Sequence, residues 1–237
     1  MAGKRHYDDG CGMAHALELV GERWALLVVR ELMLGPRRFT DLRAALPGIS
    51  PNVLSDRLDE LEASCILRHH TLPPPASVSV YELTEWGREL EPVIRDIGRW
   101  AARSPRMPSG LPMSVNSVVL SFRTMFSAEK AKGFAARIGI ELAGQPFRVE
   151  VSPERLDIQP GLAEAPDATL AGDPNAVAAV VYGGQELDQA LRGGVLRAGG
   201  DLGVLRRFVT LFPLPPKAPA LPVAAKRQRR RVPPSIG

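Results

Sequence analysis

Cysteine, histidine and long apolar runs are all scarce in this sequence of 237 residues. The two cysteines, Cys11 and Cys65, lie far apart, and neither has a histidine at the spacing of metal ligands, which argues against a disulfide framework and a zinc site. No uncharged apolar run reaches the roughly 18 residues of a membrane span, and no apolar segment follows a charged start. We therefore expect a cytoplasmic protein without a membrane span, a metal or a cofactor.

Motifs of enzyme active sites are also missing. The sequence contains no G-x-S-x-G, no glycine-rich phosphate loop, and no histidine and carboxylate pair at catalytic spacing. Two glycine pairs, Gly193–Gly194 and Gly199–Gly200, flank a predicted strand, but the helix order of a nucleotide-binding fingerprint is absent. We expect that the protein is not an enzyme.

The net charge of +4 comes entirely from one end of the chain. Residues 1–105 carry 13 basic and 15 acidic side chains, residues 106–216 carry 11 of each, and residues 217–237 carry six basic and no acidic ones. Nucleic-acid binding therefore has to be argued from the placement of single arginines and not from overall charge. The basic run Lys226–Arg231 would add salt-sensitive, non-specific affinity for phosphates.

The chain is long enough for two domains, and 45% of its residues are apolar and can fill two cores. Prolines and a glycine interrupt the sequence at 104–112, which predicts a linker, and prolines recur at 213–216. Beyond that point proline, alanine and basic residues dominate, so no packed core is expected. We place domains at 1–105 and 113–215, followed by a disordered basic tail at 216–237.

The first domain is predicted to begin with two helices. Apolar residues recur at helical spacing over 11–20, and the segment 24–34 is almost wholly apolar, so the second helix should be buried on most sides. Gly35–Pro36 ends it, and Arg37–Phe39 is expected to be short and extended.

Two further helices form the next motif. Thr40 is expected to cap a short helix at 41–46, which Pro47–Gly48 ends. Ser50 caps the following helix, with Pro51 at its favoured first position. The buried face of this helix is predicted to carry Leu54, Leu58 and Leu61. Two short helices joined by a tight turn that contains glycine are typical of a helix-turn-helix.

A β-hairpin and a long helix follow. Ile66–Leu72 and Val78–Leu83 are predicted strands, and the stiff segment Pro73–Ser77 suits the tip of a hairpin, which would be the wing. Thr84 would then cap a long amphipathic helix. Its apolar face carries Leu90, Val93, Ile94, Ile97 and Trp100. A helix with such a stripe that runs past a small domain is often a dimerisation element.

Three segments carry a resemblance to a known family: CGMAHALELVGERWALLVVR at 11–30, GPRRFTDLRAALPGISPNVLSDRLDELE at 35–62 and YELTEWGREL at 81–90. Together they resemble the HxlR-type winged-helix regulators over residues 11–102. The resemblance implies a homodimer, formed through the first and last helices, that binds a palindromic operator in double-stranded DNA. Cys65 departs from this resemblance, because the family usually has glycine at the position that closes the recognition helix. A left-handed backbone there would be strained for a residue other than glycine.

The recognition helix supplies the first candidates for DNA contacts. Such a helix enters the major groove with its N-terminus first, so its capping turn and outward face carry the contacts. Here these positions hold Ser50, Asn52 and Ser55. Asn52 can pair with adenine and the serines can donate to base edges or phosphates, although Ser50 can also serve only as the cap.

Basic residues outside that helix supply the others. Arg37 and Arg38 can pair with phosphates, or they can form ion pairs on the surface. On the first strand of the hairpin, Arg68 and His70 can reach the minor groove or its backbone.

Cys11 lies at a helix start, where the helix dipole and unpaired amide groups favour the thiolate. Some HxlR-type regulators use a cysteine at this position to sense oxidants or electrophiles, so the resemblance implies a redox role for Cys11. Two uses stay open, a sensor and an inert buried thiol. Cys65 is expected to be buried at the other end of the motif, so no disulfide between the two is expected.

The second domain is predicted to mix helices and strands. Helices are expected at 114–133, 173–182, 186–191 and 201–212, and strands at 137–142, 147–151, 156–159, 168–171 and 195–198. This order predicts a small sheet with helices over one face. The fold class of the whole chain is therefore α+β, with an N-terminal winged helix-turn-helix.

This domain resembles the sterol carrier protein type 2-like fold over residues 115–212. The resemblance rests on DATL at 167–170, VVYGG at 180–184, LDQAL at 187–191 and GGVLRAGGD at 193–201. It implies a hydrophobic tunnel for an apolar small molecule. The lining candidates are Phe122, Met125, Phe126, Val177, Val181 and Leu205. The alternatives are that these residues simply fill the core, or that the domain serves only to dimerise.

The leading hypothesis is a bacterial DNA-binding transcription regulator that acts as a repressor, modulated by an apolar ligand of the second domain or by oxidation of Cys11. The alternative is a carrier or interaction module for a lipid or another hydrophobic ligand, without specific DNA binding. Substitutions at Asn52, Arg37 and Arg38 distinguish the two, because they would leave a carrier's activity unchanged.

Overall fold

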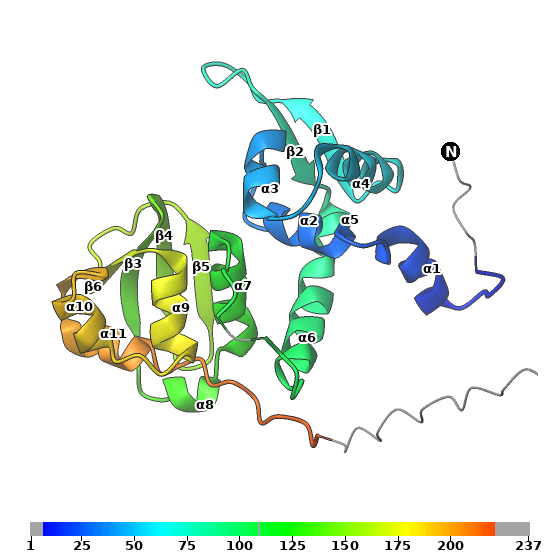
Figure 1. Cartoon of the computed structure of the whole chain (residues 1–237). Coiled ribbons are helices and arrows are strands. Elements are labelled where there is room, and N and C mark those ends of the chain that lie inside the picture. Colours follow the sequence, from blue (N-terminus) through cyan, green and yellow to red (C-terminus); the bar gives the residue numbers. More distant parts are fainter. Residues whose placement is uncertain (1–6, 109, 221–237) are drawn as a thin grey trace, which may run out of the picture.

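The computed structural model describes residues 7–108 and 110–220, and Figure 1 shows them as two regions. Each region has its own cluster of buried apolar side chains, one among residues 25–83 and the other among residues 115–212. The mixture of helices and strands confirms the predicted α+β class. Within the described part of the chain, no helix is both long and apolar enough to cross a membrane. The predicted basic run Lys226–Arg231 lies outside the described residues.

Four helices open the first region: α1 (Gly12–Val20), α2 (Ala25–Leu32), α3 (Phe39–Ala45) and α4 (Pro51–Ala63). Val28 and Val29 of α2 are fully buried, as the apolar pattern predicts. A tight turn joins α3 to α4 at Gly48, whose φ of 90° favours glycine. These elements confirm the predicted helix-turn-helix.

Two helix starts differ from the prediction. Helix α3 begins at Phe39 with Arg38 as its N-cap, so Thr40 lies inside the helix instead of capping it. The carboxylate of Asp41 accepts a hydrogen bond from the Arg38 backbone N–H at 3.4 Å, which satisfies one amide at this helix start. Helix α2 begins at Ala25 because Trp24 has a left-handed backbone, with a φ of 80°.

The wing is the hairpin of β1 (Leu67–Thr71) and β2 (Ser79–Leu83), which pair antiparallel with Leu67 opposite Leu83. Its tip projects from the body of the first region in Figure 1. The backbone of Arg37 adds a bridge to Tyr81, with hydrogen bonds of 3.0 and 2.8 Å in the two directions. This confirms both the hairpin and the extended backbone at Arg37.

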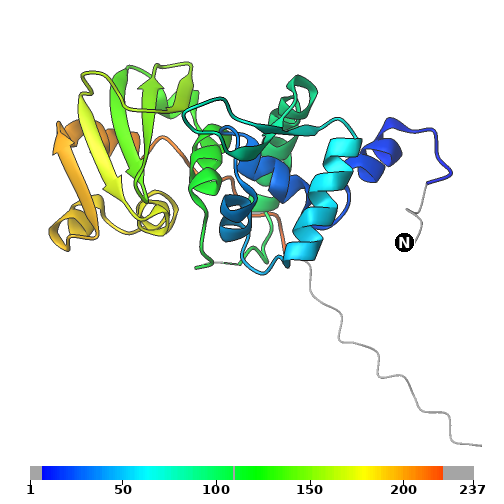
Figure 2. The same cartoon turned by 90° about the horizontal axis from the view of Figure 1, so that it is seen from above.

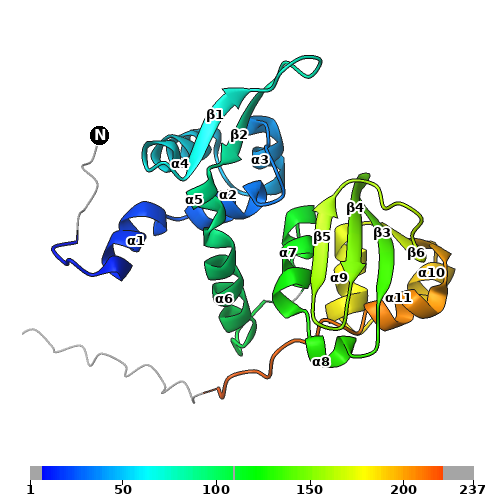
Figure 3. The same cartoon turned by 180° about the vertical axis from the view of Figure 1, so that it is seen from behind.

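Two helices, α5 (Glu85–Arg88) and α6 (Leu90–Ala102), replace the single long helix predicted after the wing. Thr84 caps α5 as predicted, because its Oγ1 accepts from the Gly87 N–H at 3.0 Å. Glu89 forms a turn between the two helices. Helix α6 extends away from the helix-turn-helix in Figures 1 and 3.

The second region contains one five-stranded sheet in the order β5-β4-β3-β6-β7. Its strands are β3 (Ala136–Leu142), β4 (Gln145–Val151), β5 (Leu156–Pro160), β6 (Ala168–Gly172) and β7 (Leu196–Gly200), and only the β3–β6 pair among them is parallel. The helices are α7 (Val115–Met125), α8 (Ala128–Ala131), α9 (Pro174–Tyr182), α10 (Leu187–Arg192) and α11 (Leu202–Phe208). They gather over one face of the sheet (Figures 1 and 3), as predicted.

Strand β3 alternates between the buried and the exposed face of the sheet. In β3, Ile138, Ile140 and Leu142 are buried, whereas Arg137 and Glu141 are exposed. The predicted helix at 114–133 is divided in two, because Phe126 leaves the helical conformation with a ψ of 132°.

Candidate nucleic-acid interface

Helix α4 has one buried and one exposed face. Leu54, Leu58 and Leu61 are 0–1% exposed, which fixes the helix in the first apolar cluster. Asn52 and Ser55 are exposed on the outward face. The Oγ of Ser50 accepts from the Val53 backbone N–H at 3.3 Å, which confirms the predicted cap. A hydroxyl that accepts in this way can still donate its proton, so a base contact by Ser50 stays a prediction.

The end of α4 is held by a left-handed turn at Cys65, whose φ is 57°. The Ile66 N–H donates to the Leu61 carbonyl at 2.9 Å, the hydrogen bond that typically ends a helix at such a turn. The hydroxyl of Thr84 donates to the Cys65 carbonyl at 2.8 Å, which joins this turn to the start of α5. Gly87 packs here so closely that a Cβ would lie 2.0 Å from the Ile66 carbonyl oxygen, so only glycine fits.

Three basic side chains lie close to the carboxylate of Glu82 at the base of the wing. Its carboxylate lies 2.6 Å from Arg68 Nη2, 2.7 Å from Arg88 Nη2 and 3.7 Å from His70 Nε2. The hydrogen bond from Arg68 is the main cause that lowers the pKa of Glu82. The side chains of Arg68 and Arg88 remain 61% and 49% exposed. The sequence analysis missed Glu82 and Arg88, although the hairpin register, which sets Arg68 opposite Glu82, was a usable signal.

The two arginines before α3 differ in their surroundings. Arg37 is partly buried, and its Nη2 donates to Asn116 Oδ1 at 2.7 Å and to Gln145 Oε1 at 3.2 Å. These partners lie in the second region, and a guanidinium bonded within the chain gives the predicted phosphate contact no support. Arg38 is exposed and stays available for such a contact.

Cys11 is the N-cap of α1, and its Sγ accepts from the Met13 N–H at 3.3 Å. The amide groups of Met13 and Ala14 lower the pKa of this exposed thiol, so it is not the buried inert thiol that was one of the two alternatives. Cys65 is exposed as well, which corrects the expectation that it is buried. Its left-handed backbone ends the helix and leaves the side chain outside the core.

Three of the six predicted lining residues of the second region are buried, and the other three are partly buried against the same apolar cluster. Phe122, Val177 and Leu205 are 0–1% exposed, and Met125, Phe126 and Val181 pack against the same apolar cluster. The ring centroid of Phe122 lies 4.6 Å from that of Phe212 and 5.9 Å from that of Phe208. Of the predicted alternatives, these contacts favour core packing over a tunnel, and a domain that serves only to dimerise stays open.

Two surface hollows in the described residues lie away from these six side chains. One of about 560 Å³ is lined by Arg137, Glu150, Arg155, Asp157 and Asp167 among others. The second, of about 370 Å³, lies over the exposed face of the sheet beside Leu162. In the part of the chain that the structure describes, no group of three or more histidine, cysteine or acidic side chains is placed to hold a metal ion.

Helices α1 and α6 expose large apolar side chains. Met13 is 63% exposed and Leu17 41% on α1, and Val93 is 48%, Ile97 45% and Trp100 75% exposed on α6. Apolar groups that gather on an exposed surface are typical of a surface that binds another protein.

Comparisons with known proteins agree with this arrangement. Residues 19–107 match the HxlR-like helix-turn-helix family, and residues 122–213 match the SCP-2 sterol transfer family. The uncharacterized HTH-type transcriptional regulator YvaP of Bacillus subtilis is 37% identical over 86 residues, which are 36% of this chain and 80% of YvaP. The HTH-type transcriptional regulator YodB of the same species is 38% identical over 89 residues, which are 38% of this chain and 80% of YodB.

Among solved structures, the reduced form of the transcriptional regulator YodB from B. subtilis matches with 33% identity and a TM-score of 0.38, over 43% of this chain and 100% of that chain. The two B. subtilis sequences are each matched over 80% of their length, and the helix-turn-helix family model covers residues 19–107, which contain most of the winged helix. The chain therefore belongs to the HxlR-like helix-turn-helix family of DNA-binding transcription regulators, and its residues 122–213 are similar to the SCP-2 sterol transfer family.

Proposed function

We propose that this protein represses transcription by binding a palindromic operator as a homodimer. The observation that carries the proposal is helix α4, which three buried leucines fix to the core while its first turn and outward face stay exposed. In a twofold dimer, the two α4 helices would enter major grooves about one helical turn of DNA apart.

The base-reading residues in this proposal are Asn52, Ser50 and Ser55. Asn52 pairs with an adenine, and the serines donate to base edges or phosphates. Arg38 at the N-cap of α3 and Arg68 and His70 on the wing contact the DNA backbone or the minor groove. Arg37 is left out, because Asn116 and Gln145 already accept from its guanidinium.

The dimer is proposed to form through α1 and α6. The exposed side chains of Met13, Leu17, Val93, Ile97 and Trp100 support this, because a second copy would remove them from water.

Residues 1–105 are proposed as the DNA-binding and dimerisation domain and residues 113–215 as a regulatory domain. The protein then acts on DNA in the cytoplasm and needs no catalysis. The basic run Lys226–Arg231 adds non-specific affinity for phosphates, which falls steeply with salt.

Cys11 is proposed as a redox sensor of the regulator. Its thiol is exposed, its pKa is lowered by two amide groups, and it starts one of the two proposed dimerisation helices. Oxidation at this position would change the packing of α1 and so weaken operator binding.

A second candidate function is the transfer or sensing of an apolar ligand, which the match of residues 122–213 to the SCP-2 sterol transfer family favours. The filled interior around Phe122 argues against a tunnel of the predicted kind. A carrier would bind a fluorescent sterol or fatty acid without enriching any DNA sequence.

Selection of genomic DNA fragments by the purified full chain at physiological salt tests the main proposal. We expect one enriched palindrome, and we expect Asn52→Ala to lower operator affinity by roughly 5- to 100-fold. Asp59→Ala is the matched control, because this exposed side chain lies two turns further along the same helix. The proposal fails if no palindrome is enriched, or if the two variants bind equally well.

A further inference from the structure

Helix α7 of the second region lies directly against two helices of the first. Figure 2 shows α7 between the sheet and the first region, and Figure 1 shows α6 and α7 side by side. Leu34, which follows α2, packs against the apolar cluster of the second region. Polar side chains bond α7 to α2, to Arg37 before α3 and to α6, and this contact zone is called the seam.

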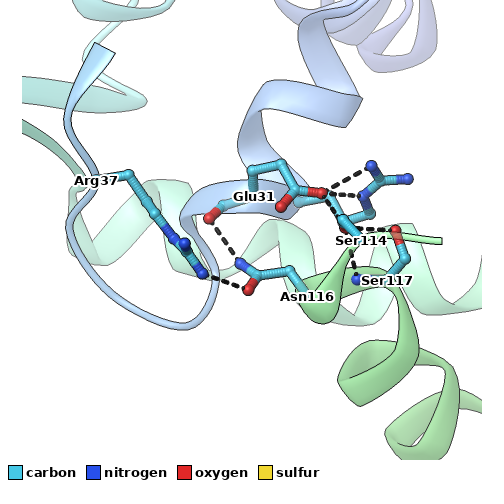
Figure 4. Close-up of polar contacts among 6 residues, drawn as sticks. Glu31, Arg37, Ser114, Asn116 and Ser117 are labelled. Atoms are coloured by element: carbon cyan, nitrogen blue, oxygen red, sulfur yellow. Dashed lines mark hydrogen bonds and ion pairs between the residues drawn. The ribbon is translucent and has the colours of Figure 1, made fainter. Parts of the chain in front are cut away.

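On the α2 side, the seam is built around a fully buried amide. Asn116 is 0% exposed, its Nδ2 donates to the Glu31 carbonyl at 2.7 Å, and its Oδ1 accepts from Arg37 at 2.7 Å (Figure 4). The Glu31 carboxylate, 1% exposed, accepts from Ser114 Oγ at 2.7 Å and from two nitrogens of Arg30 at 2.7 and 2.9 Å. Because Glu31 lies in α2 and Arg37 lies just before α3, Asn116 clamps the connection between these helices.

On the α6 side, an arginine of α7 donates hydrogen bonds to α6, and two arginines of α6 donate hydrogen bonds to α7. Arg123 of α7 donates to both carboxylate oxygens of Glu91 at 3.1 Å. In return, Arg95 of α6 donates to the Arg123 carbonyl at 2.6 Å, and Arg99 donates to the Thr124 carbonyl. These carbonyl groups belong to the last turn of α7, where cations are favoured by the helix dipole.

The segment after the second region returns to the far end of α6. Lys217 Nζ donates to the Ala102 carbonyl at 3.0 Å, and the Ala218 N–H donates to the Arg103 carbonyl at 2.7 Å. Arg103 Nε donates to the Pro216 carbonyl at 3.3 Å. The last turn of α6 is therefore also bonded to the segment that directly follows the second region.

Buried polar groups lose free energy when their partners are removed, so these contacts favour one orientation of α7 over a loose apposition of the two regions. In that orientation, α7 is bonded to the α2–α3 connection and to α6 at the same time. We propose that α7 is a positioning element for DNA recognition. Through Asn116 and Arg123 it fixes the angle between the helix-turn-helix and α6, and so sets the separation of the two recognition helices in the dimer.

This inference rests on the proposed function and adds a role for the second region that needs no ligand tunnel. A small rotation of the helix-turn-helix on α6 moves α4 of each protomer, and both displacements add to the distance between half-sites. A firm seam therefore gives a sharp preference for one half-site spacing. A loosened seam broadens that preference without changing how one α4 reads its own half-site.

The test is a set of duplexes that carry the selected half-site twice, with the centre-to-centre spacing varied by single base pairs, and one duplex with a single half-site. We expect the full-length wild type to bind the best spacing about tenfold more tightly than spacings two base pairs away. For the double variant Asn116→Ala, Arg123→Ala we expect the ratio to fall to about twofold, with single half-site affinity within about twofold of wild type.

Arg99→Ala is the second variant in case the double variant does not fold, because the Arg99 side chain is 48% exposed and its loss removes the bond to the Thr124 carbonyl and one exposed ion pair with Asp96. Arg206→Ala is the matched control, since Arg206 pairs with Asp188 of α10 at 3.0 Å, away from the seam. Unchanged spacing ratios in both seam variants would overturn the inference and leave the proposed function standing. If the wild type bound no half-site at all, the proposed function and the inference would fall together.

Discussion

Helix α6 of the first region and the aromatic cluster of the second region differ in how exposed their large apolar side chains are. On α6 of the first region, Ile97 and Trp100 are 45% and 75% exposed. In the second region, Phe122 and Phe208 are 0% exposed and pack with Phe212 in one aromatic cluster. The first region therefore retains an apolar surface that a partner can cover, whereas the second has used its largest side chains to fill its own interior.

The boundary between the regions differs from both interiors, because buried polar groups occupy it. Glu31 and Asn116 are among the few polar residues in the described chain that are fully buried, and both lie in the seam. Buried polar contacts add little net stability but penalise misaligned arrangements. The proposed division of labour is therefore that the first region binds DNA and a second copy, whereas the second region holds the orientation of the helix-turn-helix.

The largest expected effect tests whether the second region is truly filled. Phe122→Ala should lower the free energy of unfolding by roughly 3–5 kcal/mol, because the ring is fully buried and its removal leaves a cavity. Chemical denaturation followed by circular dichroism measures this change. Leu162→Ala is the control, because Leu162 is 80% exposed and its truncation should cost less than about 0.5 kcal/mol. A Phe122→Ala cost below about 1 kcal/mol would instead indicate a tunnel lined by this ring.

The next effect tests the exposed surface of the first region. Trp100→Glu should raise the dissociation constant of the dimer by about 30-fold or more, since a central tryptophan commonly contributes about 2 kcal/mol to an interface. The monomer should stay folded, because Trp100 is 75% exposed in the described chain. Sedimentation measures the dimer, with Leu162→Glu as an equally exposed control in the second region. An unchanged dimer would remove α6 from the interface.

The helix-turn-helix was predictable because its signals are local. Ser50, Pro51 and Gly48 mark a turn and a cap within a few residues, and the structure confirms each. Local signals also misled where two residues compete for one role. Thr40 is a good capping residue, but the helix starts at Phe39 and the Asp41 carboxylate bonds back to the Arg38 amide.

The seam between the regions was beyond the reach of sequence patterns. Arg37 was predicted to contact phosphates, but its partner Asn116 lies 79 positions further along the chain, and no periodicity reports such a pair. The sequence could not distinguish a tunnel lining from a packed core for a related reason. An apolar stripe such as that of Phe122 and Val177 has the same sequence pattern whether it borders a tunnel or a packed interior.

A smaller effect concerns Cys11, which lies at the start of the exposed surface. Because the Met13 and Ala14 amide groups lower its pKa, its thiolate should form at a lower pH than that of an ordinary cysteine. The rate of alkylation by iodoacetamide, followed by mass spectrometry between about pH 6 and 10, should therefore level off below the pH expected for an unperturbed thiol. Cys65 in the same sample is an internal comparison. A Cys11 rate that still rises steeply above about pH 9 would contradict the prediction.

The smallest effect concerns the backbone that joins α4 to the wing. Cys65 has a left-handed backbone with a φ of 57°. This conformation is strained for any residue that has a Cβ atom, whereas glycine adopts it without strain. Its side chain is exposed, so replacement sacrifices little apolar burial, and Cys65→Gly should raise the free energy of unfolding by about 1 kcal/mol. Cys65→Ala keeps the Cβ and should change it by less than about 0.3 kcal/mol, measured by urea denaturation. Equal stabilities of the two variants would mean that the turn is relaxed with a side chain present, and that the hydrogen bonds of Ile66 and Thr84 alone determine where α4 ends.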